Sequence, residues 1–342
     1  MQPEGAARRS RLRSGFNHQG STRLPDSPMA HAMKARTLLA TMPGFCVWVC
    51  ASLQAGPANP VLPYAEIYQR ATNEFAVASF FKPAESKTND LPFTLAPLIL
   101  QEVGRSAEAL SRLDHFGALS LSNGVPFLDR ANPAVYWQAD TVQLKGKPHV
   151  RFAYVWAYAS AAYGSIREPD DALTAGQGKA GLALHGIRIT LNSTGQPAIW
   201  EVLADSSGAE LIFVSHALEA AALAEFRKAL PGRRHAIERS GQETPKVIIA
   251  RLIDDGPMAM GPIVYLSAGS RSVSTLICRC MPAQAKKLTT TSTYDLLPFP
   301  AATAQSLLAQ TKLRAKEKTA FWPGDPGSNK RLELCLRLPS AF

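Results

Sequence analysis

Two neighbouring residues, Ser215 and His216, carry the side chains of a nucleophile and a general base. They follow the apolar segment ELIFV and precede a segment with helical spacing, so the sequence predicts them at a strand-to-helix corner. A serine nucleophile occupies such a corner in α/β-hydrolases, where glycines two residues to either side allow a sharp turn. Here those positions are Phe213 and Ala217, and a serine at such a corner is more often a helix cap. A hydrolase that uses Ser215 and His216 is therefore one hypothesis, although the sequence identifies no acidic partner for His216.

The cysteines offer a second chemistry, because Cys278, Cys280 and Cys335 all follow the N-terminal apolar segment described below. Cys278 and Cys280 lie two apart in a predicted strand, so their side chains share one face with Cα atoms about 6.5–7 Å apart. That separation is at the long end of disulfide geometry. We therefore predict that these two are not bonded to each other, unless Pro282 ends the strand early, and that any bridge involves Cys335. The alternatives are three cysteines packed as small apolar groups, such a disulfide, or a three-thiolate metal site.

Other spacings indicate no local metal or cofactor motif. The histidines after residue 56 are His115, His149, His185, His216 and His235. No two of them have the spacing of a local zinc ligand pair. Gly176, Gly178 and Lys179 lack the further glycine of a phosphate-binding loop, which favours a flexible loop. The segment 254–257 (DDGP) could offer carboxylates to a cation, but it is typical of a tight turn.

Charge is concentrated at the two ends of the chain. The 342 residues are 46% hydrophobic, 19% charged and 8% aromatic, as in an ordinary globular protein that buries one large core or two. Residues 1–36 hold seven basic and two acidic residues, residues 310–342 hold seven basic and three acidic residues, and the net charge is +10. The remainder is nearly neutral and lacks the basic stripe of a nucleic-acid-binding surface. We expect no nucleic-acid partner.

Residues 33–55 have the layout of a secretory signal peptide. A short basic start is followed by an uncharged, mostly apolar run that ends in small residues, with cleavage after Ala55 or Ala51. A retained membrane anchor is the alternative, but polar and helix-breaking residues interrupt the run, and a spanning helix needs about 20 predominantly apolar residues. We therefore expect an exported protein, whether periplasmic, envelope-associated or extracellular, that contacts the membrane only through this segment before cleavage.

Residues 1–32 precede that segment and have no apolar periodicity. They are rich in Arg, Ser, Gly and Pro, which predicts disorder. The simplest explanation is a spurious upstream extension, with translation starting at Met33 or Met29. A transit peptide is the alternative.

Residues 57–164 are predicted to form a helical segment followed by an aromatic hairpin. Helical spacing over residues 64–81 predicts one helix, and 95–103 and 106–116 are predicted as shorter ones. The strands VYWQADTVQL and HVRFAYVWAY then flank the turn KGKP. One face of the second strand carries Val150, Phe152, Tyr154, Trp156 and Tyr158. This face suits a sugar-binding platform or the core side of a sheet, and we favour the core.

Residues 165–181 are predicted to be a linker or long loop, and residues 182–342 an antiparallel α+β domain. The predicted strands lie at 187–191, 198–203, 210–214, 246–253, 261–267, 272–280 and 331–338, and the predicted helices at 216–230 and 302–318. Neighbouring strands joined by short turns are antiparallel. The fold class expected is therefore α+β, a mainly antiparallel sheet with flanking helices and a β-rich C-terminal half.

These patterns favour an exported, non-enzymatic protein that binds a ligand or partner, or is associated with the cell envelope. The apolar N-terminal segment, the β-rich body and the lack of a recognisable catalytic set support that expectation. Two alternatives remain open: a hydrolase of unfamiliar type that uses Ser215 and His216, and a thiol-based redox or metal protein built on Cys278, Cys280 and Cys335.

Overall fold

The computed structural model describes ten segments of the chain: 75–85, 90–103, 116–122, 125–159, 182–203, 210–239, 247–268, 271–281, 285–299 and 332–342. The expectations for residues 1–32, 33–55, 165–181 and 302–318 fall outside these segments, as do those for residues 64–74 and 106–115. Among the described residues, no helix combines the length and apolar character needed to cross a bilayer.

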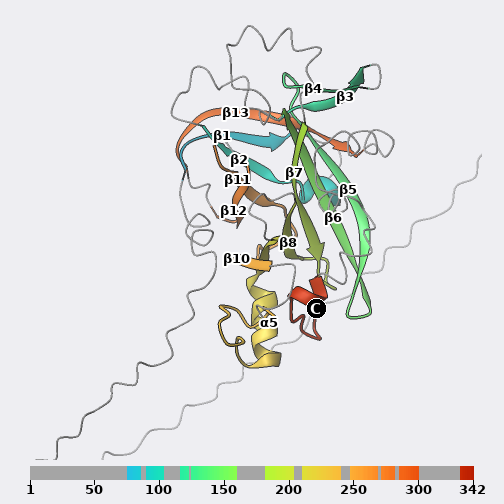
Figure 1. Cartoon of the computed structure of the whole chain (residues 1–342), viewed down its shortest axis with the longest axis vertical. Helices are drawn as coiled ribbons and strands as arrows, with labels where there is room; N and C mark the ends of the chain where they lie inside the picture. The colour runs from blue at the N-terminus through green and yellow to red at the C-terminus, as the bar shows by residue number, and fades with distance from the viewer. Residues whose placement is uncertain are drawn as a thin grey trace, which may run out of the picture. The chain divides into compact units, whose positions relative to one another are not determined.

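Strands make up most of the described segments (Figure 1). In chain order the elements are β1 (Phe75–Pro83), α2 (Leu91–Thr94), β2 (Leu98–Glu102), β3 (Ala118–Ser122), β4 (Val125–Asp129), β5 (Ala134–Leu144), β6 (Lys147–Ala159), β7 (Leu182–Leu191), β8 (Pro197–Leu203), β9 (Glu210–Ser215), α5 (His216–Phe226), β10 (Val247–Ile253), β11 (Pro262–Leu266), β12 (Val273–Cys278) and β13 (Ala285–Pro298). Residues 332–335 add a single helical turn.

Eleven strands form one mixed sheet in the order β10-β9-β8-β7-β6-β5-β13-β1-β2-β11-β12, and β3 pairs with β4 separately. Four neighbouring pairs are parallel: β9 with β10, β5 with β13, β1 with β13, and β2 with β11. The two end strands, β10 and β12, are not hydrogen-bonded to each other but lie close together. The sheet therefore curls round a shared core and leaves a seam between β10 and β12.

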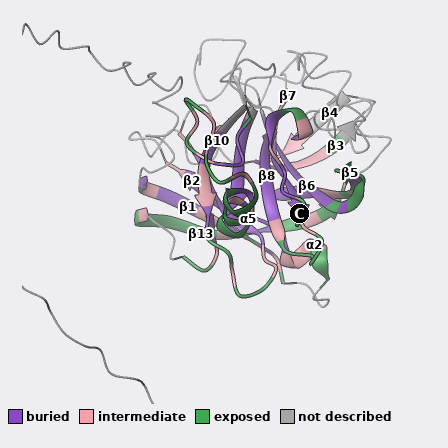
Figure 2. Ribbon diagram, turned by 90° about the horizontal axis from the view of Figure 1, so that it is seen from below, coloured by how far each residue is buried: buried purple, intermediate pink, exposed green. Residues whose placement is uncertain are grey.

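The aromatic face of β6 lies in that core, as predicted. The side chains of Tyr154, Trp156 and Tyr158 are fully buried and belong to the largest hydrophobic cluster, which also includes residues of β10 and β12. Figure 2 shows the buried residues concentrated along the central strands. Val150, at the start of the same face, is 45% exposed and marks where the core ends. The platform alternative is thus excluded for the aromatic residues.

The hairpin between β5 and β6 follows from its turn residues. Only Lys145 and Gly146 separate the paired residues Leu144 and Lys147, and both turn residues have positive φ, 49° and 75°. Two-residue turns with two positive φ angles match the right-handed twist of the flanking strands, and glycine adopts such a φ without steric cost. The turn fixes the register that turns the aromatic residues inward.

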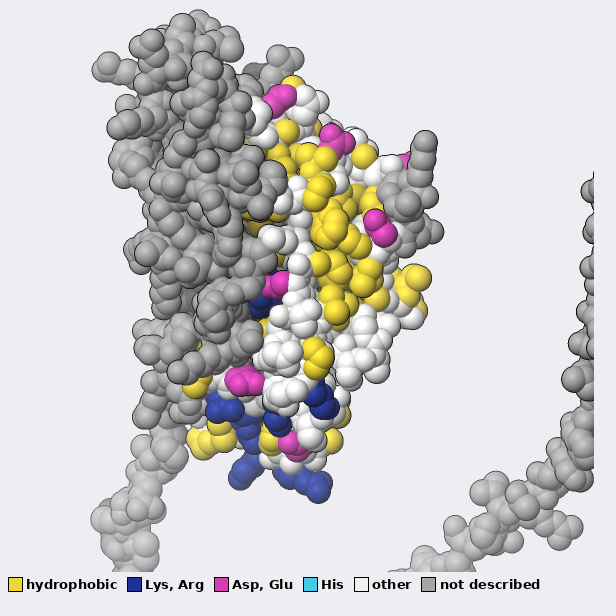
Figure 3. Space-filling view, turned by 90° about the vertical axis from the view of Figure 1, so that its right-hand side faces the viewer, with side chains coloured by type: hydrophobic (Ala, Val, Ile, Leu, Met, Phe, Trp, Pro, Cys, Tyr) yellow, Lys and Arg dark blue, Asp and Glu magenta, His cyan; other side chains and the backbone are white. Residues whose placement is uncertain are grey.

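The outer face of the sheet is covered in two places. Helix α5 and residues 332–342 bury an apolar cluster against β8, β9 and β10, and β3–β4 contributes Leu119 and Leu128 to a smaller cluster on β6–β8. Between the two clusters Arg188 and Glu201, which are cross-strand neighbours, form a buried ion pair. Figure 3 shows the side of the molecule on which β5 and β6 lie in Figure 1. In this view apolar side chains gather in the upper part and basic side chains in the lower part.

The predicted α+β class is wrong. The described residues form a mostly β structure around one large mixed sheet, with one helix longer than a single turn among them. The sequence pattern was interpreted as antiparallel throughout, yet β9, α5 and β10 form a β-α-β unit whose strands are parallel. A helical crossover is the connection that parallel pairing requires, so this signal favoured a mixed sheet.

Three local predictions are corrected as well. Residues 75–81 and 98–102, expected to be helical, form β1 and β2, which have hydrogen-bonded strands on both sides. In β1 a register shift between Ala78 and Ser79 breaks the alternation, and in β2 the three central residues are all buried, so neither segment has the period of a strand with one apolar face. Conversely, residues 332–335 are helical where a strand was predicted. Leu332, Cys335 and Leu336 are buried at helical spacing, whereas Leu334 is 38% exposed.

Candidate functional site

Ser215 ends β9 and caps helix α5. Its backbone is extended, and its Oγ accepts a hydrogen bond from the backbone N–H of Leu218 at 3.1 Å. The side chain is 2% exposed, so a substrate cannot reach the hydroxyl. Capping satisfies one of the amides that a helix leaves unpaired at its start. The position thus has the geometry of a cap and not that of an exposed nucleophile.

His216 follows at the first position of α5 and meets an acidic residue from the end of β10. Its Nε2 lies 3.3 Å from Oδ1 of Asp254, and both side chains are 53% exposed. The neighbouring Asp255 accepts a hydrogen bond from the backbone N–H of Ala217 at 2.8 Å. The parallel register pairs Ser215 with Ile253, which places the carboxyl ends of β9 and β10 side by side. Two adjacent carboxylates therefore dock onto the positive end of the helix dipole.

A cavity of about 310 Å³ opens beside this contact, and we call it the seam pocket. It is lined by the β7–β8 turn, the start of α5, the loop from β10 to β11, and the end of β12. The lining residues are Asn192, Thr194, Gln196, Pro197, Trp200, Ala217, Ile253, Asp254, Asp255, Gly256, Met258, Met260, Gly261, Pro262 and Cys278. Apolar side chains with a few polar groups are typical of a small-molecule site, and the volume is at the lower end of that class.

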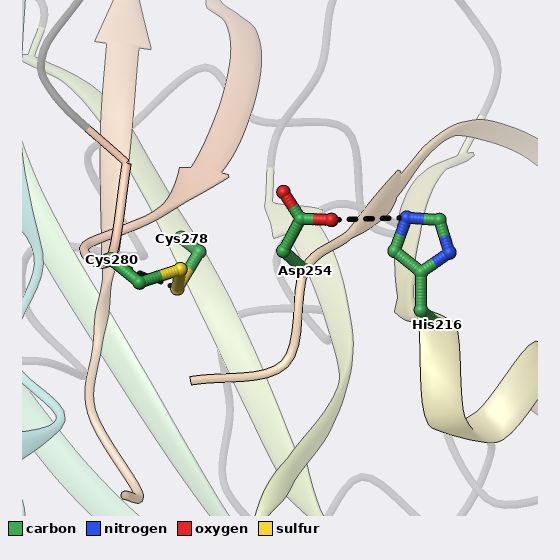
Figure 4. The surroundings of a disulfide bond; sticks show 4 residues. All are labelled: His216, Asp254, Cys278 and Cys280. Carbon is green, nitrogen blue, oxygen red and sulfur yellow. Dashed lines mark hydrogen bonds and ion pairs between the residues drawn. A yellow bond between two sulfur atoms is a disulfide. The ribbon is translucent and has the colours of Figure 1, made fainter. Parts of the chain in front are cut away.

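Cys278 and Cys280 form a disulfide beside the seam pocket (Figure 4). The prediction that they are not bonded to each other is wrong. β12 ends at Cys278 and the chain turns at the next two residues, so the Cα atoms are 5.1 Å apart instead of the extended separation assumed above. The backbone N–H of Cys280 also donates to Sγ of Cys278 at 3.1 Å. Cys278 is 6% exposed, whereas Cys280 is exposed.

Arg279, between the two cysteines, points into the core. Its Nη2 donates to the carbonyl of Ala96, and its Nε is buried without a hydrogen-bond partner among the described residues. Burial lowers the pKa of the guanidinium. The phenols of Tyr154 and Tyr294 lie close enough to favour the charge, and burial raises the pKa of both phenols, which stay neutral. The residue between the two cysteines thus places a positive charge in the core.

Cys335 is not brought to the other two cysteines. It is buried in the outer cluster under α5, whereas Cys278 belongs to the inner core. Within the described segments, no group of three or more His, Cys, Asp or Glu side chains is placed to hold a metal ion. The geometry of these three cysteines is therefore that of one disulfide and one separate buried residue.

A second hollow, of about 460 Å³, lies where the C-terminal residues meet the β5–β6 hairpin. Its basic side chains are bound to the chain itself. Lys145 Nζ donates to the carbonyl of Leu338, and Arg239 Nε donates to that of Leu336. These contacts hold the C-terminal segment against the sheet, and we assign the hollow no ligand.

Sequence reasoning missed Asp254 as the partner of His216. The β-α-β order around Ser215 was the available signal, because it places the residue after β10 next to the start of α5. The resulting His–Asp contact supplies a base and its orienting carboxylate, two parts of a hydrolytic triad. Among the described pocket-lining residues the one hydroxyl belongs to Thr194, which donates to Asn192 at 2.8 Å.

Comparisons with models of protein families, with curated proteins and with solved structures found no match to this chain.

Proposed function

We propose that the protein is exported and binds a small organic ligand in the seam pocket. The observation that carries the proposal is the pocket itself, whose wall combines Trp200, Met258 and Met260 with polar side chains at the rim. The apolar part of a ligand would pack on these three side chains. Asp254 and Asp255 each direct one oxygen to α5, so the remaining oxygens favour a ligand with an amine or another positively charged group.

Binding accounts for this arrangement better than hydrolysis does. The exposed His–Asp pair stands at the pocket rim, but the neighbouring serine is buried as a helix cap. A nucleophile must lie within hydrogen-bond reach of its base and face the substrate. The described lining residues offer no such group, whereas they do offer apolar area and carboxylates.

Two observations support export. Residues 33–55 have the basic start, apolar run and small-residue end of a signal peptide. The chain has a disulfide between Cys278 and Cys280, and disulfides form in oxidising compartments outside the cytosol. We place the mature protein in the periplasm, at the envelope or outside the cell.

Ligand binding is tested with a fragment library of amines, neutral compounds and carboxylates, using ligand-observed NMR on the purified protein. A Cβ at Gly256 would lie 3.6 Å from both Cys278 Sγ and Met260 Cγ, and the φ there is not in the left-handed region. Gly256→Leu should therefore block the pocket, while Gly256→Ala is the matched control for loss of the glycine. We expect amines to bind best, and we expect their binding to be lost in Gly256→Leu. Binding that is unchanged in Gly256→Leu would contradict the assigned site.

Export is tested by N-terminal sequencing of the protein recovered from its native host. We expect an extracytoplasmic fraction and a terminus between residues 51 and 58, following the small-residue end of the apolar run. A terminus at Met1 or Met33 in cytoplasmic protein would refute export and leave the ligand experiment unaffected.

A further inference from the structure

We propose that the Cys278–Cys280 disulfide is redox-active and exchanges with dithiols that reach it at the exposed residue Cys280. This activity is separate from ligand binding in the seam pocket and does not depend on it.

The position of the disulfide argues against a purely structural role. A disulfide stabilises a fold mainly by closing a long loop of the unfolded chain, and the effect grows with loop length. Cys278 and Cys280 are two apart and both lie at the end of β12, so the bridge joins no separate elements. Removing it costs little loop-closure entropy, and the fold has no evident need for it.

The two sulfurs differ in accessibility, which gives the exchange a direction. Cys280 is exposed after the end of β12, whereas Cys278 is buried against the loop that follows β10. A Cβ built at Gly256 of that loop would lie 3.6 Å from Cys278 Sγ, so the loop packs beside this sulfur. An incoming thiolate therefore attacks Sγ of Cys280, and Sγ of Cys278 is the leaving group.

The surroundings stabilise the leaving thiolate. The backbone N–H of Cys280 already donates to Sγ of Cys278 at 3.1 Å, and a hydrogen bond to sulfur strengthens when the sulfur becomes an anion. Asp254 and Asp255 line the same pocket and oppose the charge, but both are exposed to solvent, which screens them.

The exchange balances with a dithiol as the co-reactant. The first substrate thiolate forms a mixed disulfide with Cys280 and breaks the bond to Cys278, which leaves as a thiolate. The second substrate thiolate then attacks its own partner sulfur in the mixed disulfide and releases Cys280. The substrate loses two electrons and becomes a disulfide, and Cys278 and Cys280 gain the two electrons and two protons.

The test follows the redox state of the full-length protein under native conditions. Reduced dithiothreitol and a peptide with a Cys-x-x-Cys pair are added separately, free thiols are alkylated, and tryptic fragments are weighed. Cleavage after Arg279 places Cys278 and Cys280 in different fragments that only the disulfide joins. Reduction by the peptide supports a polypeptide substrate, and reduction by dithiothreitol alone supports a small dithiol. If neither reduces the bridge until denaturant is added, the proposal is overturned.

Single-cysteine variants test the direction of attack. Cys278→Ser leaves the exposed Cys280 and should form a mixed disulfide with oxidised glutathione about tenfold faster, or more, than Cys280→Ser, which leaves the buried Cys278. Cys335→Ser is the control that retains the disulfide, and it should exchange as the wild type does. Equal rates for the first two variants would contradict the assignment. If a variant does not fold, native-state reduction of the wild-type bridge alone decides.

Discussion

His185 on β7 makes the stability of the fold dependent on pH. Its ring lies edge-on to Tyr158, with centroids 5.8 Å apart, and Arg271 lies over the same tyrosine. Burial, and then the positive charge of Arg271, lower the pKa of His185 from 6.5 to about 4. The folded protein therefore holds the imidazole neutral at pH values where an unfolded chain would protonate it.

The magnitude follows from proton linkage. The pKa of His185 is lower in the folded than in the unfolded chain. Its contribution to the free energy of unfolding is therefore complete above pH 6.5, decreases as the pH falls from 6.5 to about 4, and changes no further below that. Between about pH 7 and about pH 5 the unfolded chain gains roughly 2 kcal/mol from protonation that the folded chain does not gain. His185 is partly exposed, so water reduces the effect, and we expect a loss of about 1–2 kcal/mol.

The measurement is urea unfolding of the wild type and His185→Gln at both pH values. Glutamine keeps a neutral polar side chain but does not titrate in this range. The free energy of unfolding of the wild type should fall relative to that of the variant by about 1–2 kcal/mol on acidification. Carboxyl groups that titrate in this range affect the wild type and the variant equally, so their contribution to the free energy of unfolding cancels in the comparison. Parallel pH profiles for the two proteins would show that His185 is protonated in the fold and would refute the reasoning.

Two further predictions address residues that the sequence singled out. Trp156 is fully buried in the inner core, so Trp156→Ala should lower the free energy of unfolding by about 3–5 kcal/mol in denaturant titration, and an unchanged midpoint would contradict its core role. Ser215 caps α5, so Ser215→Ala should cost about 1 kcal/mol by the same measurement and leave ligand binding intact, whereas Ser215→Asp should retain most of the stability.

Local patterns predicted those parts of the fold in which turn residues or a cap bound an alternating or apolar run. The hairpin of β5 and β6, the strands β7 to β12 and the start of α5 were all anticipated in this way. Period-two alternation identified β6, and short apolar runs between turns identified β8, β9 and β11, which are buried on both faces. The same argument correctly placed Trp156 in the core.

Strands with an irregular pattern were missed. β13 was not anticipated at all, because its threonine-rich segment from 286 to 291 is exposed residue after residue and has no apolar face. β1 and β2 were taken for helices because neither alternates: a register shift between Ala78 and Ser79 interrupts β1, and the three central residues of β2 are all buried. Without alternation or clear turn signals, prediction from one sequence does not recognise a strand.

The seam pocket could not be predicted from local sequence patterns, for a different reason. Each of its distinctive residues has a sufficient local explanation: a serine caps a helix, two aspartates and a glycine make a turn, and two cysteines end a strand. These residues come together because of the strand order of the sheet, which ends at β10 on one side and at β12 on the other. Ile253 and Cys278, the last residues of these two strands, both line the pocket. Had the two strands been hydrogen-bonded, their ladder would close the seam. The unpaired seam thus places a cavity, a carboxylate pair and a disulfide at one edge, and this arrangement follows from topology and not from any motif.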